Sequence, residues 1–214
     1  NLAIDKNKII QLAMNGKGSP IYTNMSPVMS KFLWDAPEEK ADPQKAKQIL
    51  EEKKLLPMEF TLKVPNSSKI YLDTAQSIRE QLKDIGITVN LEVIEWATWL
   101  SDVYTNRKYV ASLAGLAGKM EPDAILRRYT STYAKNFTNF NNTRYDVLVE
   151  EAKRTSNEAK QIENYKEAQK ILSEEQAAIF LMDPNIIIAT EKGIEGFEFY
   201  PLPYLNFAKL YFKK

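Results

Sequence analysis

The residues most able to do chemistry are four carboxylates in the middle of the chain. Glu92, Glu95, Glu121 and Asp123 would lie near one end of a sheet if the strands expected around them end together. Two carboxylates about 5–10 Å apart can hydrolyse a glycosidic bond. Carboxylates that are solvated or purely structural are far commoner. We therefore expect no catalytic residue and no enzyme, and a carboxylate hydrolase acting through Glu121 remains an alternative.

The composition excludes most other chemistry. The 214 residues include no Cys and no His, so thiol nucleophiles, imidazole ligands and Ser-His-Asp triads are impossible. We find no phosphate loop or dinucleotide fingerprint, and we expect no metal and no cofactor. Lys and Arg number 29 against 28 Asp and Glu, without the basic excess or stripe that is typical of nucleic-acid binders. No apolar run approaches the roughly 20 residues of a membrane-spanning helix.

A glycine-containing loop at 114–122 is the best candidate for a binding cleft. It follows an apolar segment at 109–113, expected to be a strand, and precedes a helix expected at 122–128. In open α/β sheets, ligands bind beyond the carboxyl ends of the strands. We expect this loop to line the cleft through Gly115, Leu116, Gly118, Lys119, Met120 and Glu121.

An aromatic pair and an Asn-rich loop supply the remaining candidates. Trp96 and Trp99 are three residues apart on a helix expected at 97–105. This spacing fits core packing, and it equally fits an aromatic wall beside a ligand. We take Trp96 as a candidate ligand contact, together with Asn136 and Asn139 of the Asn-rich loop at 136–142.

The elements that must position these residues form an α/β pattern. Strands expected at 59–64 and 87–94 flank a helix expected at 70–85, which favours a parallel pair with a right-handed crossover. Further helices are expected at 5–15, 42–53, 144–154 and 158–174, and buried strands at 177–182 and 186–190 around a turn at 183–185.

Two segments fit no regular element. The stretch 19–39 contains three Pro, and its side chains include Tyr22, Met25, Met29, Phe32 and Trp34, which predicts a long connection pinned to the core. The aromatic tail 197–212 should be extended, and nothing near it in sequence offers an obvious sheet partner. The chain has no initial Met and no signal-peptide core, so we interpret it as the middle of a longer protein.

Short patterns follow one another along nearly the whole chain. They are Ala3-Ile4-Asp5 with Ile9, Gly16 and Gly18; Asp42 with Ala46-Lys47 and Leu50; Ala75 with Ile78, Leu82 and Ile85-Gly86-Ile87; Glu95-Trp96 with Leu100; Asn139-Phe140 with Tyr145-Asp146 and Leu148; and Tyr165 with Ala168 and Leu172. In their order and spacing they resemble the C-terminal portion of the family 5 extracellular solute-binding proteins. These are the oligopeptide, dipeptide and nickel receptors of ABC importers.

The resemblance implies a fold, partners and a location. The fold would be α/β, a lobe like those of type II periplasmic binding proteins, with a mixed, largely parallel sheet flanked by helices. Residues 1–195 would form the second lobe, and residues 196–214 would return to a missing N-terminal lobe. The partners would be a peptide or other small solute, that N-terminal lobe and an ABC permease, with no nucleic acid. The protein would lie outside the cytoplasmic membrane, held by a lipid anchor beyond this chain.

The chain departs from the family at two positions that contact the ligand in peptide-binding members. Peptide-binding members carry an Asp four residues before the Pro of the helix that follows the loop, and often a Trp seven residues before it. Counting back from Pro122, these positions are Gly118 and Gly115. Two glycines would open space for a larger ligand, and Lys119 would favour an anionic or neutral solute, such as an oligosaccharide or a modified peptide. Glu121 could take the role of the missing Asp, and a sensor domain of a transcriptional regulator is the alternative function.

Overall fold

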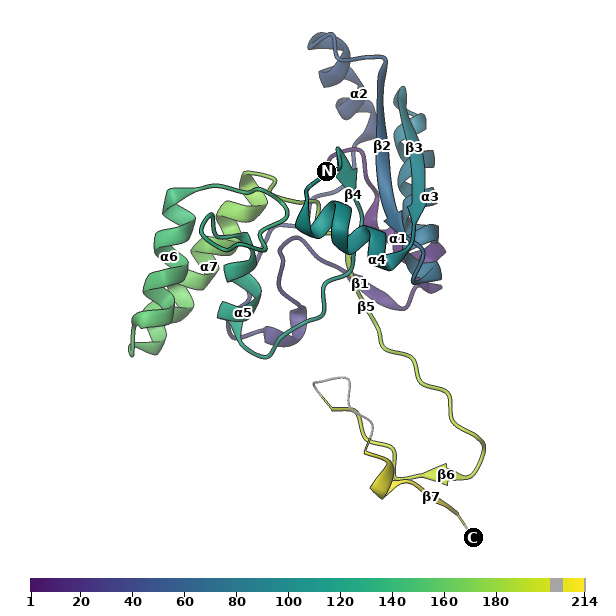
Figure 1. The fold of residues 1–214 in the computed structure, drawn as a ribbon, viewed down its shortest axis with the longest axis vertical. Coiled ribbons are helices and arrows are strands. Elements are labelled where there is room, and N and C mark those ends of the chain that lie inside the picture. Colours follow the sequence, from purple (N-terminus) through teal and green to yellow (C-terminus); the bar gives the residue numbers. More distant parts are fainter. Residues whose placement is uncertain (201–205, 214) are drawn as a thin grey trace.

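The βαβ unit expected from the sequence forms the centre of one half of the molecule (Figure 1). The computed structural model describes residues 1–200 and 206–213. Strand β2 (Met58–Pro65), helix α3 (Lys69–Lys83) and strand β3 (Ile87–Ile94) follow in order, and β2 pairs with β3 in parallel from Met58↔Ile87 to Pro65↔Ile94. A short third strand, β4 (Ala111–Ser112), lies parallel to β2 on its other edge. The resulting sheet has the order β3-β2-β4.

Local sequence signals begin and end the helices around this sheet. Helix α1 (Lys6–Met14) starts at Asp5, whose side chain accepts hydrogen bonds from the N–H groups of Asn7 and Lys8. It ends where Asn15 adopts φ +51°, the left-handed conformation that commonly terminates helices. Helix α2 (Pro43–Glu52) is capped by Asp42 and has Pro in its first turn.

Apolar side chains from this half form one buried cluster. Its fully buried members are Ala3, Ala46, Leu62, Val64, Ala75, Ile85, Ile87 and Val89. They come from the N-terminal segment, α2, the sheet strands, α3 and the segment that follows α3. The register places the strand residues of this cluster on one face of the sheet, so α2 and α3 cover that face. We call this half, comprising α1, α2, α3, α4 (Trp96–Trp99) and the sheet, the sheet group.

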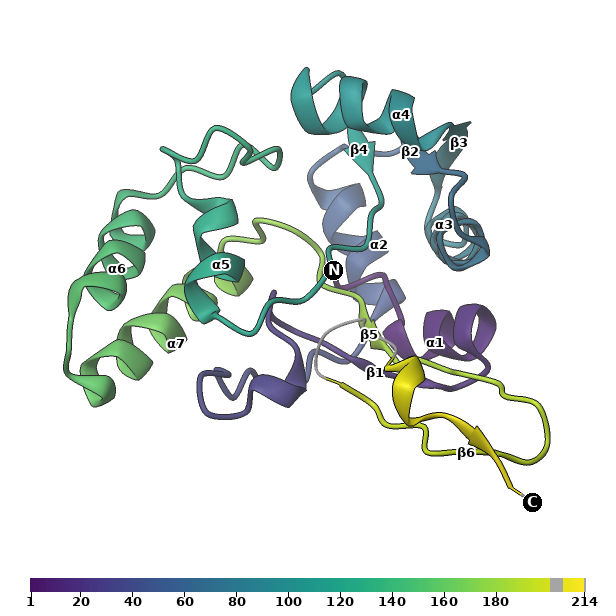
Figure 2. The ribbon, with the colours of Figure 1, turned by 60° about the horizontal axis from the view of Figure 1, so that its bottom comes forward.

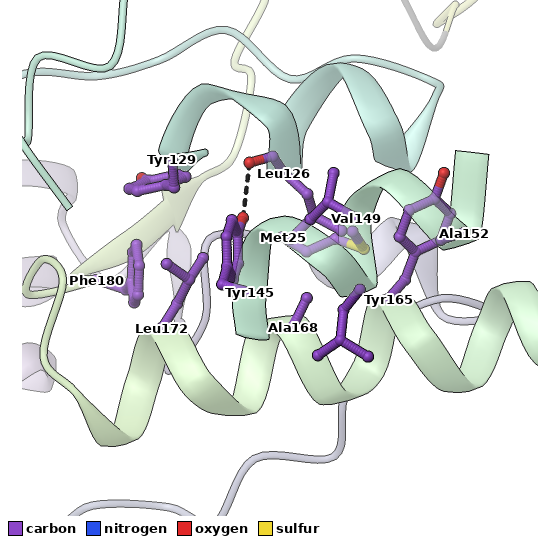
Figure 3. Close-up of a cluster of buried hydrophobic side chains, with 11 residues drawn as sticks. Met25, Leu126, Tyr129, Tyr145, Val149, Ala152, Tyr165, Ala168, Leu172 and Phe180 are labelled. Carbon is purple, nitrogen blue, oxygen red and sulfur yellow. Dashed lines mark hydrogen bonds between the residues drawn. The ribbon is translucent and has the colours of Figure 1, made fainter. Parts of the chain in front are cut away.

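The other half is built from helices. Helix α5 (Pro122–Leu126), a short 3-10 turn (Arg127–Tyr129), α6 (Thr143–Arg154) and α7 (Glu158–Glu174) pack together, and we call them the helix group. Figure 3 shows their buried cluster, in which the Tyr145 hydroxyl donates a 2.6 Å hydrogen bond to the carbonyl of Leu126. Burial raises the pKa of Tyr145 well above its usual 10.0, so this hydroxyl stays a donor at physiological pH.

The connection at 19–39 is pinned to the core, as expected. Met25 is fully buried in the helix-group cluster, and the ring of Phe32 meets that of Tyr165 edge-on at 6.0 Å. A short 3-10 turn at Pro27–Met29 lies within the connection. The fully buried side chain of Gln169 on α7 also holds it, by donating to the Phe32 carbonyl and accepting from the Trp34 N–H. The connection is thus held by a polar side chain, Gln169, as well as by apolar ones.

A small antiparallel pair joins the early and late parts of the chain. Strand β1 (Gly18–Pro20) lies beside β5 (Met182–Pro184), with Gly18 opposite Pro184. A Cβ at Gly18 would lie 3.1 Å from the carbonyl oxygen of Asp183, so glycine allows the two backbones to approach closely.

The buried strands expected at 177–182 and 186–190 are wrong. Residues 186–190 form no strand and are exposed, Ile186 by 67% and Ile187 by 62%. Of 177–182 only Met182 is in a strand, and the predicted turn at Asp183-Pro184 is part of β5. The apolar composition of residues 186–190 predicted burial. These residues instead run outward from the body with no described strand beside them (Figure 1).

The aromatic tail contains a strand whose pairing partner the sequence did not indicate. Strand β6 (Ile194–Glu195), just before the tail, pairs antiparallel with β7 (Tyr211–Phe212), and a 3-10 turn (Phe207–Lys209) precedes β7. Residues 201–205 and 214, which include the tail's Pro201 and Pro203, lie outside the described residues. Among the described residues, no helix is long and apolar enough to cross a membrane.

Candidate functional site

The loop expected to line the cleft joins the two groups of elements. It covers residues 113–121, leaving β4 at the carboxyl edge of the sheet and crossing to α5 (Figure 2). At its start, the Leu113 N–H donates to the Lys63 carbonyl at 3.1 Å. Farther along, the Arg128 guanidinium donates to the Ala117 carbonyl at 3.1 Å. The loop is thus held at its start, by the sheet edge where ligands bind in α/β folds, and at its central residue, Ala117.

The second half of the loop, residues 118–121, is exposed. A Cβ at Gly118 would meet no heavy atom within 4 Å, and Met120 is 61% exposed. Within the described residues, neither the side chain of Lys119 nor that of Glu121 forms a hydrogen bond or ion pair. The loop therefore offers a free cation, a free carboxylate and open backbone for a ligand.

The carboxylate of Glu121 also influences α7. Burial, followed by the charges of Asp123 and Glu121, raises the pKa of Tyr165 to about 12. The phenol therefore remains neutral at any physiological pH. The carboxylate end of the loop is electrostatically coupled to the helix group.

The space at Gly115 is filled, which corrects the expectation that both glycines open the site. The Tyr71 hydroxyl from α3 lies 2.8 Å from where a Cβ of Gly115 would stand. Ordinary side chains almost never approach so closely, so glycine is required while Tyr71 keeps its position. Space is open at Gly118 and closed at Gly115.

This contact predicts a coupled pair of substitutions. We expect Gly115→Ala to lower the free energy of unfolding by about 0.5–1.5 kcal/mol, because the new methyl must move the part-exposed phenol of Tyr71 off its preferred rotamer. In a Tyr71→Ala background the same change should cost less than about 0.5 kcal/mol. Urea denaturation of the four proteins of this cycle measures the difference. An equal cost in both backgrounds would contradict the contact.

The two tryptophans divide between core and surface. Their rings stack with centroids 5.0 Å apart and planes 3° apart. Trp99 is 1% exposed, whereas Trp96 is 38% exposed. Trp99 is thus a core residue, and Trp96 presents a ring backed by another ring, a surface suited to an apolar or aromatic ligand group.

The four carboxylates differ in their partners. The Asn66 amide donates to Glu95 at 2.6 Å, and Asp123 lies 3.8 Å from Arg127. Glu92 lies 3.6 Å from the Lys63 ammonium. Three of them are engaged with neighbours, and in the described part of the chain no group of three or more acidic side chains could hold a metal ion.

The two asparagines occupy different environments. Asn136 is buried, and its amide donates to the carbonyls of Tyr129, Thr130 and Phe140 while its oxygen accepts from Thr138. Its side chain is therefore used to fold its own loop. Asn139 is exposed at φ +58°, a conformation that Asn tolerates better than most residues.

Lys63 and Asp102 were not among the predicted site residues. The ammonium of Lys63 lies 3.2 Å from the carboxylate of Asp102, which belongs to the π-helical segment Leu100–Thr105 that continues α4. Lys63 lies near the end of the alternating run on β2, and this position is the signal that could have placed it at the carboxyl edge of the sheet.

The ion pair between Lys63 and Asp102 makes the free energy of unfolding depend on pH. The hydrogen bond from Lys63 and then its positive charge, with smaller effects of Ser101 and Lys108, hold the pKa of Asp102 below its usual 3.8. A lowered carboxyl pKa stabilises the fold above its unfolded-state pKa, and this stabilisation is lost as the pH falls through the folded-state value. We expect the urea midpoint of the wild type to fall more steeply below about pH 4 than that of Asp102→Asn. Parallel curves at all pH values would contradict this.

A hollow of about 500 Å³ lies away from the loop. It is lined by Trp34 and by residues of α6 and α7 that include Arg144, Glu163, Lys166 and Glu167. Two cations face two anions on its wall, and none of the predicted site residues lines it. We assign it no ligand.

Comparisons with known proteins agree on one family. The family model described as bacterial extracellular solute-binding proteins, family 5 middle region, matches residues 1–137. The oligopeptide-binding protein AppA of Bacillus subtilis is 27% identical over 93% of this chain, and a dipeptide-binding protein of Pseudomonas aeruginosa is 27% identical over 94%. The chain spans only 40% and 39% of those two relatives.

Solved structures agree as well. AppA of Bacillus subtilis in complex with a nonapeptide superposes with a TM-score of 0.85 at 26% identity, covering all of this chain and 46% of that one. The DppA protein of Helicobacter pylori in complex with the peptide STSA superposes with a TM-score of 0.86 at 22% identity, covering all of this chain and 43% of that one. These matches confirm the resemblance and the type II periplasmic-binding-protein fold stated from the sequence.

Proposed function

Because this chain belongs to the bacterial extracellular solute-binding proteins of family 5, we propose that it is one lobe of the receptor of an ABC importer. In this proposal the receptor captures a peptide or another small solute outside the cytoplasmic membrane and delivers it to a permease. Residues 1–195 form the second lobe, and residues 196–214 return to a first lobe elsewhere in the protein. A lipid anchor, if present, belongs to that other part.

The observation that carries the proposal is the 113–121 loop. It joins the two groups of elements at the carboxyl edge of the sheet and leaves Gly118, Lys119 and Glu121 open to a ligand. A loop that is fixed at its start and centre and exposed after Ala117 is suited to bind a solute without forming a catalytic centre. The relatives are named as binding proteins, which fits a receptor that performs no reaction.

The mechanism is a shift in a conformational equilibrium. A ligand that contacts both lobes binds the closed state more tightly than the open one, and so it increases the population of the closed state. This chain would contribute the exposed ring of Trp96 and the loop residues from Leu116 to Glu121. Asn139 is exposed and stays a candidate.

The charges of the loop select among ligands. A peptide with a free amino terminus needs an anion to accept it, and Glu121 is the free carboxylate of the loop. Lys119 instead favours a carboxylate, a phosphate or a neutral polar solute. Removing the charge of Lys119 should therefore weaken the binding of an anionic ligand. Removing the charge of Glu121 should weaken the binding of a peptide with a free amino terminus.

The test uses the full-length protein and isothermal titration calorimetry. The probes are a pool of tri- to nonapeptides, the same pool with acetylated amino termini, and neutral and anionic oligosaccharides. If the ligand is anionic, Lys119→Ala should weaken its binding about tenfold, the loss of one charge-assisted contact. If it is a free peptide, Glu121→Gln should do so. Binding of some probe that neither variant nor Trp96→Ala alters would contradict the site, and binding of no probe would contradict the function.

A further inference from the structure

Trp99 contacts two parts of the candidate site at once. Besides stacking on Trp96, its indole N–H donates a 2.8 Å hydrogen bond to the Ser112 hydroxyl, the last residue of β4. Ser112 is directly followed by the 113–121 loop. One buried side chain therefore touches both the exposed ring of Trp96 and the start of the loop.

The Ser112 hydroxyl continues this contact to β2. It donates to the Lys63 carbonyl at 2.9 Å while accepting from Trp99, so its single proton has one defined direction. The same carbonyl accepts the Leu113 N–H. Lys63 also reaches Asp102 beyond α4 through its side chain. The sheet edge, the end of α4 and the first loop residue are thereby held in one network.

The Trp99 ring also packs against two further aromatic rings, and one of them is far away in sequence. Phe137 meets it edge-on at 5.7 Å with a 76° angle, and Tyr104 stacks beside it at 6.1 Å. The Arg107 guanidinium donates to the carbonyls of Ala134 and Asn136 nearby. The indole of Trp99 therefore packs against three aromatic rings and is held by a hydrogen bond at its N–H.

We propose that Trp99 is a positioning residue of the binding site, which through its bond to Ser112 fixes the Trp96 ring and the start of the 113–121 loop relative to each other. The inference rests on the proposed function and deepens it. Trp99 need not touch the ligand. Its polar edge holds two surfaces that do, and they come from segments that would otherwise move separately.

A purely structural role makes a different prediction. If Trp99 only fills the core, deleting the Ser112 hydroxyl should leave the Trp96 ring where it is, since both indoles remain. If the hydrogen bond aligns them, Ser112→Ala should release Trp96, while Ser112→Thr, which keeps a hydroxyl, should not. Stability alone does not separate these roles, so the test follows the ring directly.

The test labels the full-length protein with 5-fluorotryptophan and records its fluorine NMR spectrum. The Trp96 resonance is the one that disappears in Trp96→Phe, whatever other tryptophans the protein contains. We expect one sharp Trp96 signal in the wild type and in Ser112→Thr. In Ser112→Ala it should broaden or split, and its shift between H₂O and D₂O should increase. Trp34→Phe is the matched control and should leave the signal unchanged.

A second arm measures affinity for whichever peptide or oligosaccharide pool the wild type binds. Ser112→Ala should weaken it about five- to tenfold and Ser112→Thr less than about twofold, the range expected for one neutral hydrogen bond. An unchanged Trp96 signal in Ser112→Ala would overturn the positioning role. A changed signal with no ligand bound by the wild type would uphold the alignment of Trp96 and overturn the proposed function instead.

Discussion

Replacing Gln169 by leucine should lower the free energy of unfolding by about 3 kcal/mol or more. The fully buried amide donates to the carbonyls of Phe32 and Tyr165, at 2.7 and 3.0 Å, and accepts from Thr23 and the Trp34 N–H, at 3.1 and 3.2 Å. Leucine fills a similar volume but leaves the connection's polar groups buried without partners. Each such group costs about 1–3 kcal/mol.

Urea denaturation of the 214-residue chain measures this loss. The matched control is Gln44→Leu, the same replacement at an exposed position of α2, which should change the free energy by less than about 0.5 kcal/mol. Limited proteolysis should also cut the 21–34 segment faster in the Gln169 variant. If Gln169→Leu unfolds at the wild-type midpoint, the connection is not held by this amide.

Met25→Ala should be the second large effect, with a loss of about 2–5 kcal/mol. The Met25 side chain has no exposed surface and lies among residues of α6 and α7, including Val149 and Tyr165 (Figure 3). Alanine removes three heavy atoms from this cluster and leaves a cavity that the surrounding helices can only partly close.

Met120→Ala is its matched control, because Met120 is 61% exposed in the 113–121 loop. It should change stability by less than about 0.5 kcal/mol. Thermal and urea unfolding of both variants measure the contrast. Equal effects at the two methionines would show that the connection lies on the surface rather than in the core.

The sequence predicted those parts of the fold that depend on neighbouring residues. Asp5 and Asp42 cap the helices they precede, as their positions predicted. The strand–helix–strand order alone predicted the parallel pairing of β2 with β3. These signals are local. Capping bonds span three residues, and the alternation of a half-buried strand is visible in the strand itself.

Parts that depend on distant partners were predicted less well. Ile186, Ile187 and Ile188 are as apolar as a buried strand, but burial requires a neighbouring surface, and the described residues offer none. Strand β7 pairs with β6 across a separation in sequence that no local pattern reveals. Gln169 is polar on a charged helix, and only the returning 21–34 segment gives it a buried role.

The candidate site shows the same division. The position of the 113–121 loop follows from the βαβ order, because loops at the carboxyl edge of parallel strands are adjacent. That Tyr71 fills the space at Gly115 did not follow, since the two residues are far apart in sequence. The separate roles of Trp96 and Trp99 also required the structure, because three-residue spacing places both on one side of a helix.

The central claim, that this chain is part of a solute receptor, is tested most directly by native mass spectrometry of the full-length protein purified from its own host. We predict a folded species heavier than the polypeptide, whose extra mass leaves on denaturation. A ladder of peptide masses would assign peptides to the receptor, and a single discrete mass would assign another solute. A folded protein that carries only its own mass, and gains none after incubation with peptide, oligosaccharide and anionic solute pools, would contradict the account.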